Sequence, residues 1–282
     1  MKKICTLFSI LLIISCQNFG QLKLLASLPD ELKEASGIEK TNNSDLLWML
    51  NDGGNKPVIY GVDLNGNIVR KVYVNAKNKD WEDITSDEKG NLYIGDFGNN
   101  NNKRKDLKVL KIKYEDLLTK DKVEVEKIKF YYPSQQKFPP KKKDRFYDAE
   151  SMFYKNGFIY VFTKSRVKGN YGKTSLYKIP IKKGNYVAKY ISEYKSCNDL
   201  HCWTTAAAIS PNGKKVALLN HQSILIFTDF KGDDFFSGVV KEYPFNHISQ
   251  KEGIVFKDNN TLYITDEKAH LHGGNLYEFS IK

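Results

Sequence analysis

The stretch WEDITSDEKGNLYIGD occupies residues 81–96 and has the pattern of a β-hairpin. It opens on a polar-then-apolar run, passes through an Asp-Glu-Lys-Gly-Asn turn, and continues as Leu92-Tyr93-Ile94 before ending at Asp96. Short runs rich in aromatic and β-branched residues, separated by turn residues, indicate paired strands. The fold depends on whether this hairpin stands alone or belongs to a series.

The same hairpin occurs five times along the chain. Each copy opens with a comparable signature: Ser36-Gly37-Ile38, Glu82-Asp83-Ile84, Glu150-Ser151-Met152, Ala206-Ala207-Ala208-Ile209 and Glu252-Gly253-Ile254. Each second strand then ends in a polar group: Asn51-Asp52, Asp96, Lys164, Asn220-His221 and Asp266. Self-similarity at intervals of about forty to fifty residues is typical of propeller blades. The longest interval, between Glu82 and Glu150, holds a loop at 134–145 rather than another blade.

These repeats predict an all-β fold, a five-bladed β-propeller, with a six-bladed propeller as the alternative. A third strand is visible in every repeat, and a fourth strand in all but the last. The apolar stretch 22–28 precedes the first repeat and has no partner there. It is expected to supply the missing outer strand of the last blade, because closing the ring removes unpaired strand edges.

Residues 1–15 are predicted to be a signal peptide, residues 16–21 a linker, and residues 22–282 the propeller domain. Lys2 and Lys3 precede an apolar stretch that is too short to span a bilayer. The sequence Ile-Ile-Ser-Cys at 13–16 resembles the lipobox of bacterial lipoproteins, which implies lipidation at Cys16 and attachment to a membrane. An ordinary secretory signal is the alternative. The segment after Cys16 lacks an acidic cluster, which favours an outer-membrane lipoprotein of the cell envelope facing the periplasm.

Two further features concern charge and cysteines. The chain has a formal net charge of +11, with basic runs at 103–113 and 137–145. Runs of this kind are either solvated loops or sites that contact anionic lipid or other polyanions. No nucleic-acid-binding module is recognisable in the sequence. Cys197 and Cys202 are predicted to form a disulfide, while His201 between them makes a metal site the alternative.

The start of each first strand and the end of each second strand meet at one mouth of a propeller's channel. The first set is predicted to bind a metal: Ser36, Glu82, Glu150 and Glu252, with Thr205 in place of Ala206. The second set is predicted to act on a substrate: Asp52, Asp96, His221 and Asp266 in catalysis, and Lys164, Arg166 and Trp81 in substrate binding. Carboxylates crowded in a narrow ring recruit a cation, and hard oxygen ligands suit Ca²⁺. In the alternative, the glutamates bind backbone amides of neighbouring blades.

The order of Ser36, Glu82, Glu150 and Glu252 resembles the inner ring of the calcium-activated nucleotidases (soluble apyrases), a five-bladed propeller family. The segment 251–256 is similar to that family's last-blade Glu-Gly-Ile signature, and 51–53 and 163–166 stand where it has an acidic and a basic loop. The resemblance implies a central Ca²⁺. Ala206 departs from the pattern because it carries no ligating oxygen.

Three functions remain open at the level of sequence. The first is Ca²⁺-dependent hydrolysis of phosphate anhydrides or esters in a small anionic substrate. The second is a non-catalytic binding or assembly module of the cell envelope. The third is a lactonase, because 81–84 and 95–100 also resemble uncharacterised bacterial propeller lipoproteins close to the SMP-30-like lactonases. Fold alone does not decide among them.

Overall fold

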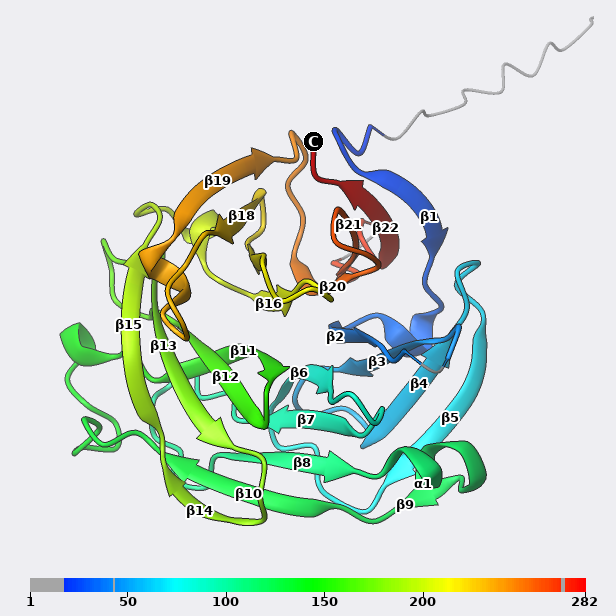
Figure 1. Ribbon diagram of the computed structural model, residues 1–282, viewed down its shortest axis with the longest axis horizontal. Helices are drawn as coiled ribbons and strands as arrows, with labels where there is room; N and C mark the ends of the chain where they lie inside the picture. Colours follow the sequence, from blue (N-terminus) through cyan, green and yellow to red (C-terminus); the bar gives the residue numbers. More distant parts are fainter. Residues whose placement is uncertain (1–17, 43, 270–271) are drawn as a thin grey trace, which may run out of the picture.

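Five β-sheets surround a central axis in a computed structural model that describes residues 18–42, 44–269 and 272–282 (Figure 1). Each sheet is one blade of a β-propeller, with its innermost strand beside the axis. The five-bladed prediction is therefore confirmed, and the six-bladed alternative is wrong. The predicted signal peptide, residues 1–15, and the predicted lipidation site, Cys16, lie outside the described residues.

Within each blade the strands follow one another outward from the axis. Blade one contains β2 (Ala35–Lys40), β3 (Leu47–Asn51), β4 (Val58–Val62), β5 (Ile68–Val74) and β9 (Lys122–Val123). Blade two contains β6 (Trp81–Ser86), β7 (Leu92–Asp96), β8 (Lys108–Ile112), β10 (Glu126–Tyr131) and β14 (Gly184–Val187). Blade three contains β11 (Asp148–Lys155), β12 (Phe158–Lys164), β13 (Lys173–Pro180) and β15 (Lys189–Lys195).

The last two blades are each built from four strands. Blade four contains β16 (Ala206–Ile209), β17 (Val216–Leu219), β18 (Ser223–Thr228) and β19 (Val239–Pro244). Blade five contains β20 (Lys251–Phe256), β21 (Thr261–Asp266), β22 (Asn275–Ser280) and β1 (Lys23–Ser27). The connections include one short α-helix and four 3-10 turns: α1 (Tyr114–Thr119), η1 (Asp30–Leu32), η2 (Lys142–Asp144), η3 (Leu200–Cys202) and η4 (Phe235–Ser237).

The N-terminal strand closes the ring, as the sequence predicts. β1 pairs antiparallel with β22, with Lys23 opposite Glu278 and Ser27 opposite Asn275. The backbone N–H of Leu28 donates to the carbonyl of Gly274 at 2.7 Å, which extends the contact beyond the strand. Blade five is thus made from both ends of the chain, and its outer edge depends on the first described residues.

Two short outer strands were not predicted. The sequence suggests one strand over 123–131, whereas the structure divides it between two blades. Val123 lies in β9, which pairs parallel with β5 of blade one, and β10 of blade two starts only at Glu126. β14 likewise pairs parallel with β10 across a blade boundary. Both strands cover an outer edge that would otherwise be unpaired, a common way of protecting sheets from edge-to-edge association.

The hydrophobic core is divided among the five interfaces between neighbouring blades. Trp48 of blade one and Trp81 of blade two are both fully buried in one such cluster, with Ile84 and Leu110. Face-to-face packing of twisted sheets explains why strands of a blade carry apolar side chains on both faces. The ring is therefore held by continuous packing around the axis.

Side chains also connect the innermost strands of blades one, two and three to one another across their axis-facing edges. The carboxylate of Asp83 accepts the backbone N–H of Met152 at 2.7 Å, and Thr85 Oγ1 accepts that of Tyr154 at 3.2 Å. Glu39 Oε2 accepts the N–H of Ser86 at 3.0 Å in the same way between blades one and two. These bonds matter because an inner strand has no strand partner on its axial side, and buried backbone groups need partners.

Replacing Asp83 by Ala is expected to lower the free energy of unfolding by about 1–3 kcal/mol. The side chain is buried and its carboxylate also accepts the N–H of Ile84, so its loss leaves two backbone donors without a partner. Thermal and urea unfolding of the variant measure the change. Asp121→Ala, with a side chain that is 91% exposed, is the matched control and should leave stability within about 0.5 kcal/mol of the parent. Equal stability of the two variants would contradict this role of Asp83.

The predicted disulfide is present. Cys197 and Cys202 are joined in the loop that contains η3, and Gln222 Nε2 donates to the Cys202 sulfur at 3.4 Å. The alternative metal site at this loop is therefore wrong, because both thiols are consumed. Within the described ranges, no helix is long and apolar enough to cross a bilayer.

Candidate metal centre

A β-bulge opens the first strand of four blades. In each of these blades the strand register shifts at a single residue, which has no direct partner on the second strand. These bulged residues are Ser36, Glu82, Glu150 and Glu252. A bulge releases one residue from the ladder and redirects its side chain, and bulges are frequent beside functional sites. The repeat signature that defines the fold thus also turns four polar side chains toward one place.

These four side chains line a single cavity of about 130 Å³ at the axis. The remaining lining residues are Asp52, Asn100, Lys164, Arg166, Gln250 and Glu267. Five of the ten side chains are carboxylates and two are cationic. The cavity therefore carries an excess of negative charge when its groups are ionised, an arrangement that favours a bound cation over a free anion.

Three carboxylates converge beside this cavity, and two of them, Asp52 and Glu82, line it. Oxygens of Asp52, Asp80 and Glu82 lie within 4.8 Å of one another, close enough to share one metal ion. Asn78 brings the two loops together, because its Nδ2 donates to the carbonyl of Asp52 at 2.8 Å and its Oδ1 accepts the N–H of Trp81 at 3.0 Å. The cluster joins blades one and two, off the centre of the ring.

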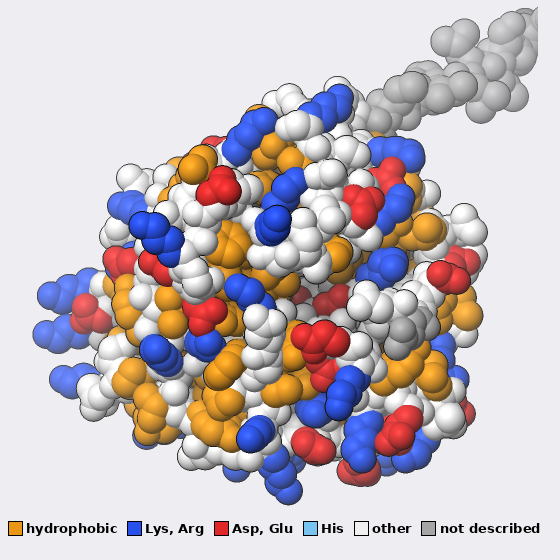
Figure 2. All heavy atoms as spheres, viewed as in Figure 1, with side chains coloured by type: hydrophobic (Ala, Val, Ile, Leu, Met, Phe, Trp, Pro, Cys, Tyr) orange, Lys and Arg blue, Asp and Glu red, His pale blue; other side chains and the backbone are white. Residues whose placement is uncertain are grey.

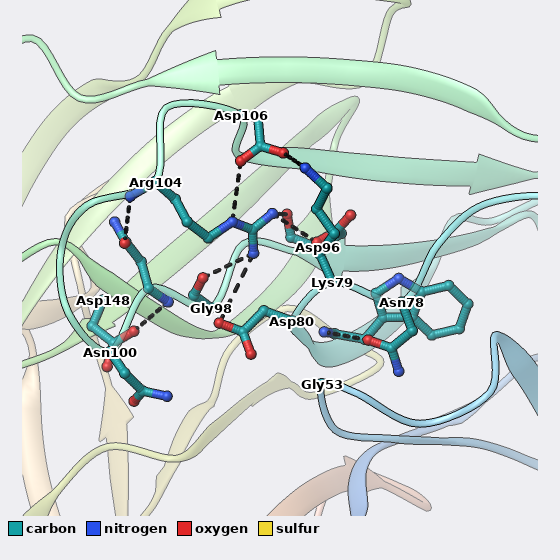
Figure 3. Close-up of polar contacts among 12 residues, drawn as sticks. Gly53, Asn78, Lys79, Asp80, Asp96, Gly98, Asn100, Arg104, Asp106 and Asp148 are labelled. Carbon is teal, nitrogen blue, oxygen red and sulfur yellow. Dashed lines mark hydrogen bonds and ion pairs between the residues drawn. The ribbon is translucent and has the colours of Figure 1, made fainter. Parts of the chain in front are cut away.

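Two glycines make room for this cluster. A Cβ at Gly98 would lie 2.6 Å from Cγ of Asp80 and would collide with Oε1 of Glu82. A Cβ at Gly53 would similarly collide with Oδ1 of Asp80. Figure 3 shows Asp80 beside Gly98 and below the guanidinium of Arg104, which lies 4.0 Å from Asp80 Oδ2. Because glycine has no side chain, the carboxylates can approach the backbone at positions 53 and 98.

The protonation of these carboxylates is strongly perturbed. Burial, with repulsion from Glu150 and Asp80, raises the pKa of Asp52 to about 7. Burial also raises the pKa of Asp80, and it raises that of Glu82 well above its usual value, with Glu150 and Asp52 adding repulsion. Desolvated like charges at this spacing are stabilised only by protons or by a cation. The cluster is therefore suited to take up a metal ion as its protons leave.

Glu150, from the neighbouring blade three, lines the same cavity and already has cationic partners. Its Oε2 lies 2.9 Å from Lys164 Nζ, and its Oε1 lies 3.1 Å from Arg166. Burial would raise the pKa of Glu150, but these two cations hold it below its usual value. Arg166 also binds Asp148. These ion pairs give Glu150 a structural role that competes with the predicted role as a metal ligand. Lys164 and Arg166, which were predicted to bind substrate, are themselves engaged with protein carboxylates.

The predicted hydroxyl ligands act as ties between blades. Ser36 Oγ donates to the carbonyl of Glu82, and Thr205 Oγ1 donates to the carbonyl of Lys251 at 2.6 Å. Both hydroxyls thereby satisfy a carbonyl at the start of the next inner strand. Thr205, which was predicted to replace Ala206 in the ring, is not among the residues that line the cavity.

Glu252 lies beside His221, one of the residues predicted to act in catalysis. Its Oε1 is 3.5 Å from Nε2 of His221, whose backbone N–H donates to the carbonyl of His201 at 3.2 Å. The disulfide loop therefore positions the histidine against the cavity wall. Glu267, which sequence reasoning missed, lines the same side, and burial with repulsion from Glu252 and Asp52 raises its pKa to about 8.

Three other predicted site residues lie outside the cavity lining. Asp96 is fully buried between Arg104 and Lys108, at 2.8 and 2.6 Å. Asp266 accepts the backbone N–H of Asn275 and the hydroxyl of Tyr277, both at 2.9 Å. Trp81 is fully buried in the core between blades one and two. Asp96 and Asp266 end second strands and Trp81 begins the innermost strand β6, and all three side chains are held within or between the blades rather than at the cavity.

Comparison with known proteins supports the fold only. No family model and no curated protein matches the sequence. Among solved structures, the PQQ-bound aldose sugar dehydrogenase of Streptomyces coelicolor aligns with a TM-score of 0.53 and 11% identity over 93% of this chain and 98% of that one. The Swd1 β-propeller domain of Myceliophteria thermophila gives 0.46 and 10% over 93% and 100%. A catalytically inactive virginiamycin B lyase of Staphylococcus aureus gives 0.44 and 16% over 90% and 69%.

Proposed function

We propose that the protein binds one divalent cation, Ca²⁺, through Asp52, Asp80 and Glu82. The observation that carries this proposal is the convergence of the three carboxylates within 4.8 Å of one another, where Asp52 and Glu82 border a cavity with excess negative charge. Gly53 and Gly98, which leave space for two of these carboxylates, support it further. Ca²⁺ accepts six to eight oxygens with flexible geometry, which suits a set of carboxylates completed by solvent.

The proposed reaction is hydrolysis of a phosphate anhydride or ester. A cation bound to this cluster would supply the positive charge that an anionic substrate needs in an otherwise acidic cavity. As a ligand of the bound ion, Asp52 would help to hold it beside the substrate. Lys164 and Arg166 neutralise the charge of Glu150, so that the Glu150 carboxylate does not repel an anionic substrate. The resemblance to the calcium-activated nucleotidases supports this chemistry.

We further propose that the propeller is anchored in the cell envelope by lipid on Cys16, at the outer membrane and facing the periplasm. The lipobox-like sequence at 13–16 supports the anchor. The disulfide between Cys197 and Cys202 supports an oxidising compartment.

A non-catalytic binding module is the second candidate. It is favoured by one observation, which is that Lys164 and Arg166 are both engaged by Glu150 and Asp148. Metal-stripped protein assayed on nucleoside polyphosphates, phosphate monoesters and lactones distinguishes the two. Hydrolysis of a phosphate compound that needs added Ca²⁺ and stops with chelator supports the hydrolase. Ca²⁺ binding without turnover of any of these compounds would support the binding module instead.

Without metal, the protein is expected to become less stable as the pH rises from about 4 to about 8. Asp52 and Glu267 have folded-state pKa values of about 7 and about 8, above their unfolded values, so the folded state holds more protons in this window. Stability linked to those protons is present at low pH and is lost as each group ionises. Melting temperatures from pH 5 to pH 8 should fall in chelator and should fall much less in millimolar Ca²⁺. A chelated protein whose melting temperature rises over this range would contradict the assignment.

A further inference from the structure

Seven exposed lysines gather on three loops around blades two and three. The loops span 97–107, 132–147 and 165–172, and each follows a strand that ends on the face where the axial cavity lies. The lysines are Lys103, Lys105, Lys137, Lys141, Lys142, Lys143 and Lys168. The same loops expose two acidic side chains, Asp106 and Asp144, and Asp106 is already paired with Lys79 and Arg104. We call this set the lysine patch.

Polar contacts hold two of the three loops together. Gln135 Nε2 donates to the carbonyl of Asn102 at 2.8 Å, and Asn102 Oδ1 accepts the backbone N–H of Tyr147 at 2.9 Å. The ammonium of Lys105 in the first loop lies 5.0 Å from the ring of Phe138 in the second. These contacts join the first two loops, so that their lysines share one surface. Figure 2 shows Lys and Arg side chains projecting from the edge where the green 132–147 loop lies in Figure 1.

The N-terminal segment meets the propeller on the same face. Phe19 packs against His247 and Tyr277, with ring centroids 5.5 and 5.4 Å apart, and Gln21 N donates to the carbonyl of Phe245 at 2.8 Å. The loop 245–250 connects β19 to β20, as 132–147 connects β10 to β11. Cys16 precedes Asn18 by two residues, which limits their separation to about 7 Å. A lipid on Cys16 would therefore hold this face near the membrane.

We propose that the lysine patch docks on the surface of an anionic lipid bilayer. Lysines near such a surface each strengthen binding, and a basic patch adds to the attachment that an acyl anchor provides. The patch lies across the ring from the N-terminal segment (Figure 1), so anchor and patch together fix how the propeller sits on the bilayer. This inference is independent of the metal site.

The test uses the mature chain with Cys16→Ser, which has no acyl group, and vesicles of phosphatidylcholine with or without phosphatidylglycerol. Co-sedimentation is expected only with phosphatidylglycerol, and 0.5 M NaCl should abolish it because salt screens surface charge. The triple variant Lys141→Gln, Lys142→Gln, Lys143→Gln should partition about 100-fold more weakly, at about fivefold per lysine.

The matched control replaces three exposed lysines on loops of the opposite face, as Lys182→Gln, Lys183→Gln, Lys214→Gln. It removes the same charge and should bind the vesicles like the parent. Equal losses in both triple variants would overturn the proposal, since binding would then follow net charge alone. Binding to heparin without binding to phosphatidylglycerol vesicles would also overturn it and assign the lysine patch to a soluble polyanion.

Discussion

Asp80→Asn is expected to weaken Ca²⁺ binding at least about 100-fold. Outer-shell partners of metal ligands are commonly worth 10–100-fold in affinity, and loss of a charged ligand costs at least as much. Calorimetric titration of chelator-treated protein gives the affinity, and the stabilisation of the folded state by Ca²⁺ gives an independent reading. Asp121→Asn, on an exposed side chain far along the chain from the cluster, is the control and should bind like the parent.

The same variant should not be less stable in chelator. Asp80 is a carboxyl whose pKa is raised by burial, so neutralising it removes repulsion with its neighbours in the metal-free state. Gly98→Ala is also expected to weaken Ca²⁺ binding. Its added methyl group would displace Asp80 and Glu82, although both carboxylates remain. Parent-like Ca²⁺ affinity in both Asp80→Asn and Gly98→Ala would show that the cluster does not bind the ion.

Deleting residues 18–28 is expected to lower the free energy of unfolding by at least about 5 kcal/mol. The deletion removes two core leucines, Leu22 and Leu28, each worth about 2–5 kcal/mol, and it exposes the edge of β22. The melting temperature should fall by more than about 10 °C, and the protein should self-associate through the open edge.

Scanning calorimetry and sedimentation measure these two effects. Leu24→Ser is the control within the same strand, because the Leu24 side chain is 40% exposed and its loss leaves the pairing with β22 in place. If the truncated protein aggregates too readily for calorimetry, Leu28→Ala tests the packing of the N-terminal segment instead. This variant should lower the free energy of unfolding by about 2–5 kcal/mol. A truncated protein as stable as the parent would show that the ring does not depend on its N-terminal strand.

The fold was predictable because its information is local and repeated. Each hairpin signature specifies an inner strand, a turn and a second strand, and the stretch 22–28 supplies the missing partner of β22. The strands β9 and β14 were not predictable in the same way. They are two and four residues long, and each pairs with a strand of the neighbouring blade, so no pattern within a repeat specifies them.

The candidate site was predicted less completely, for two physical reasons. The bulged positions were found from the repeats, but a sequence does not show that Ser36 Oγ is used by a carbonyl or that Glu150 is neutralised by Lys164. Asp80 was missed because it lies in a loop before the signature, where repeats do not align.

Glu267 was missed because of register. Lys251 pairs with Asp266 just as Ala35 pairs with Asn51, so Glu267 stands at the position of Asp52, one residue after the second strand. An alignment of the repeats anchored on the second strand rather than the first would have shown this correspondence.

The most direct test of the metal centre is a crystal structure of the mature protein soaked in Ca²⁺, with Mn²⁺ as an anomalous scatterer in a parallel crystal. We expect one ion bound by oxygens of Asp52, Asp80 and Glu82, at Ca–O distances of about 2.3–2.6 Å. Anomalous density at this position in the parent and none in Asp80→Asn would establish the site. An ordered cavity with no ion, or an ion bound elsewhere on the ring, would contradict it.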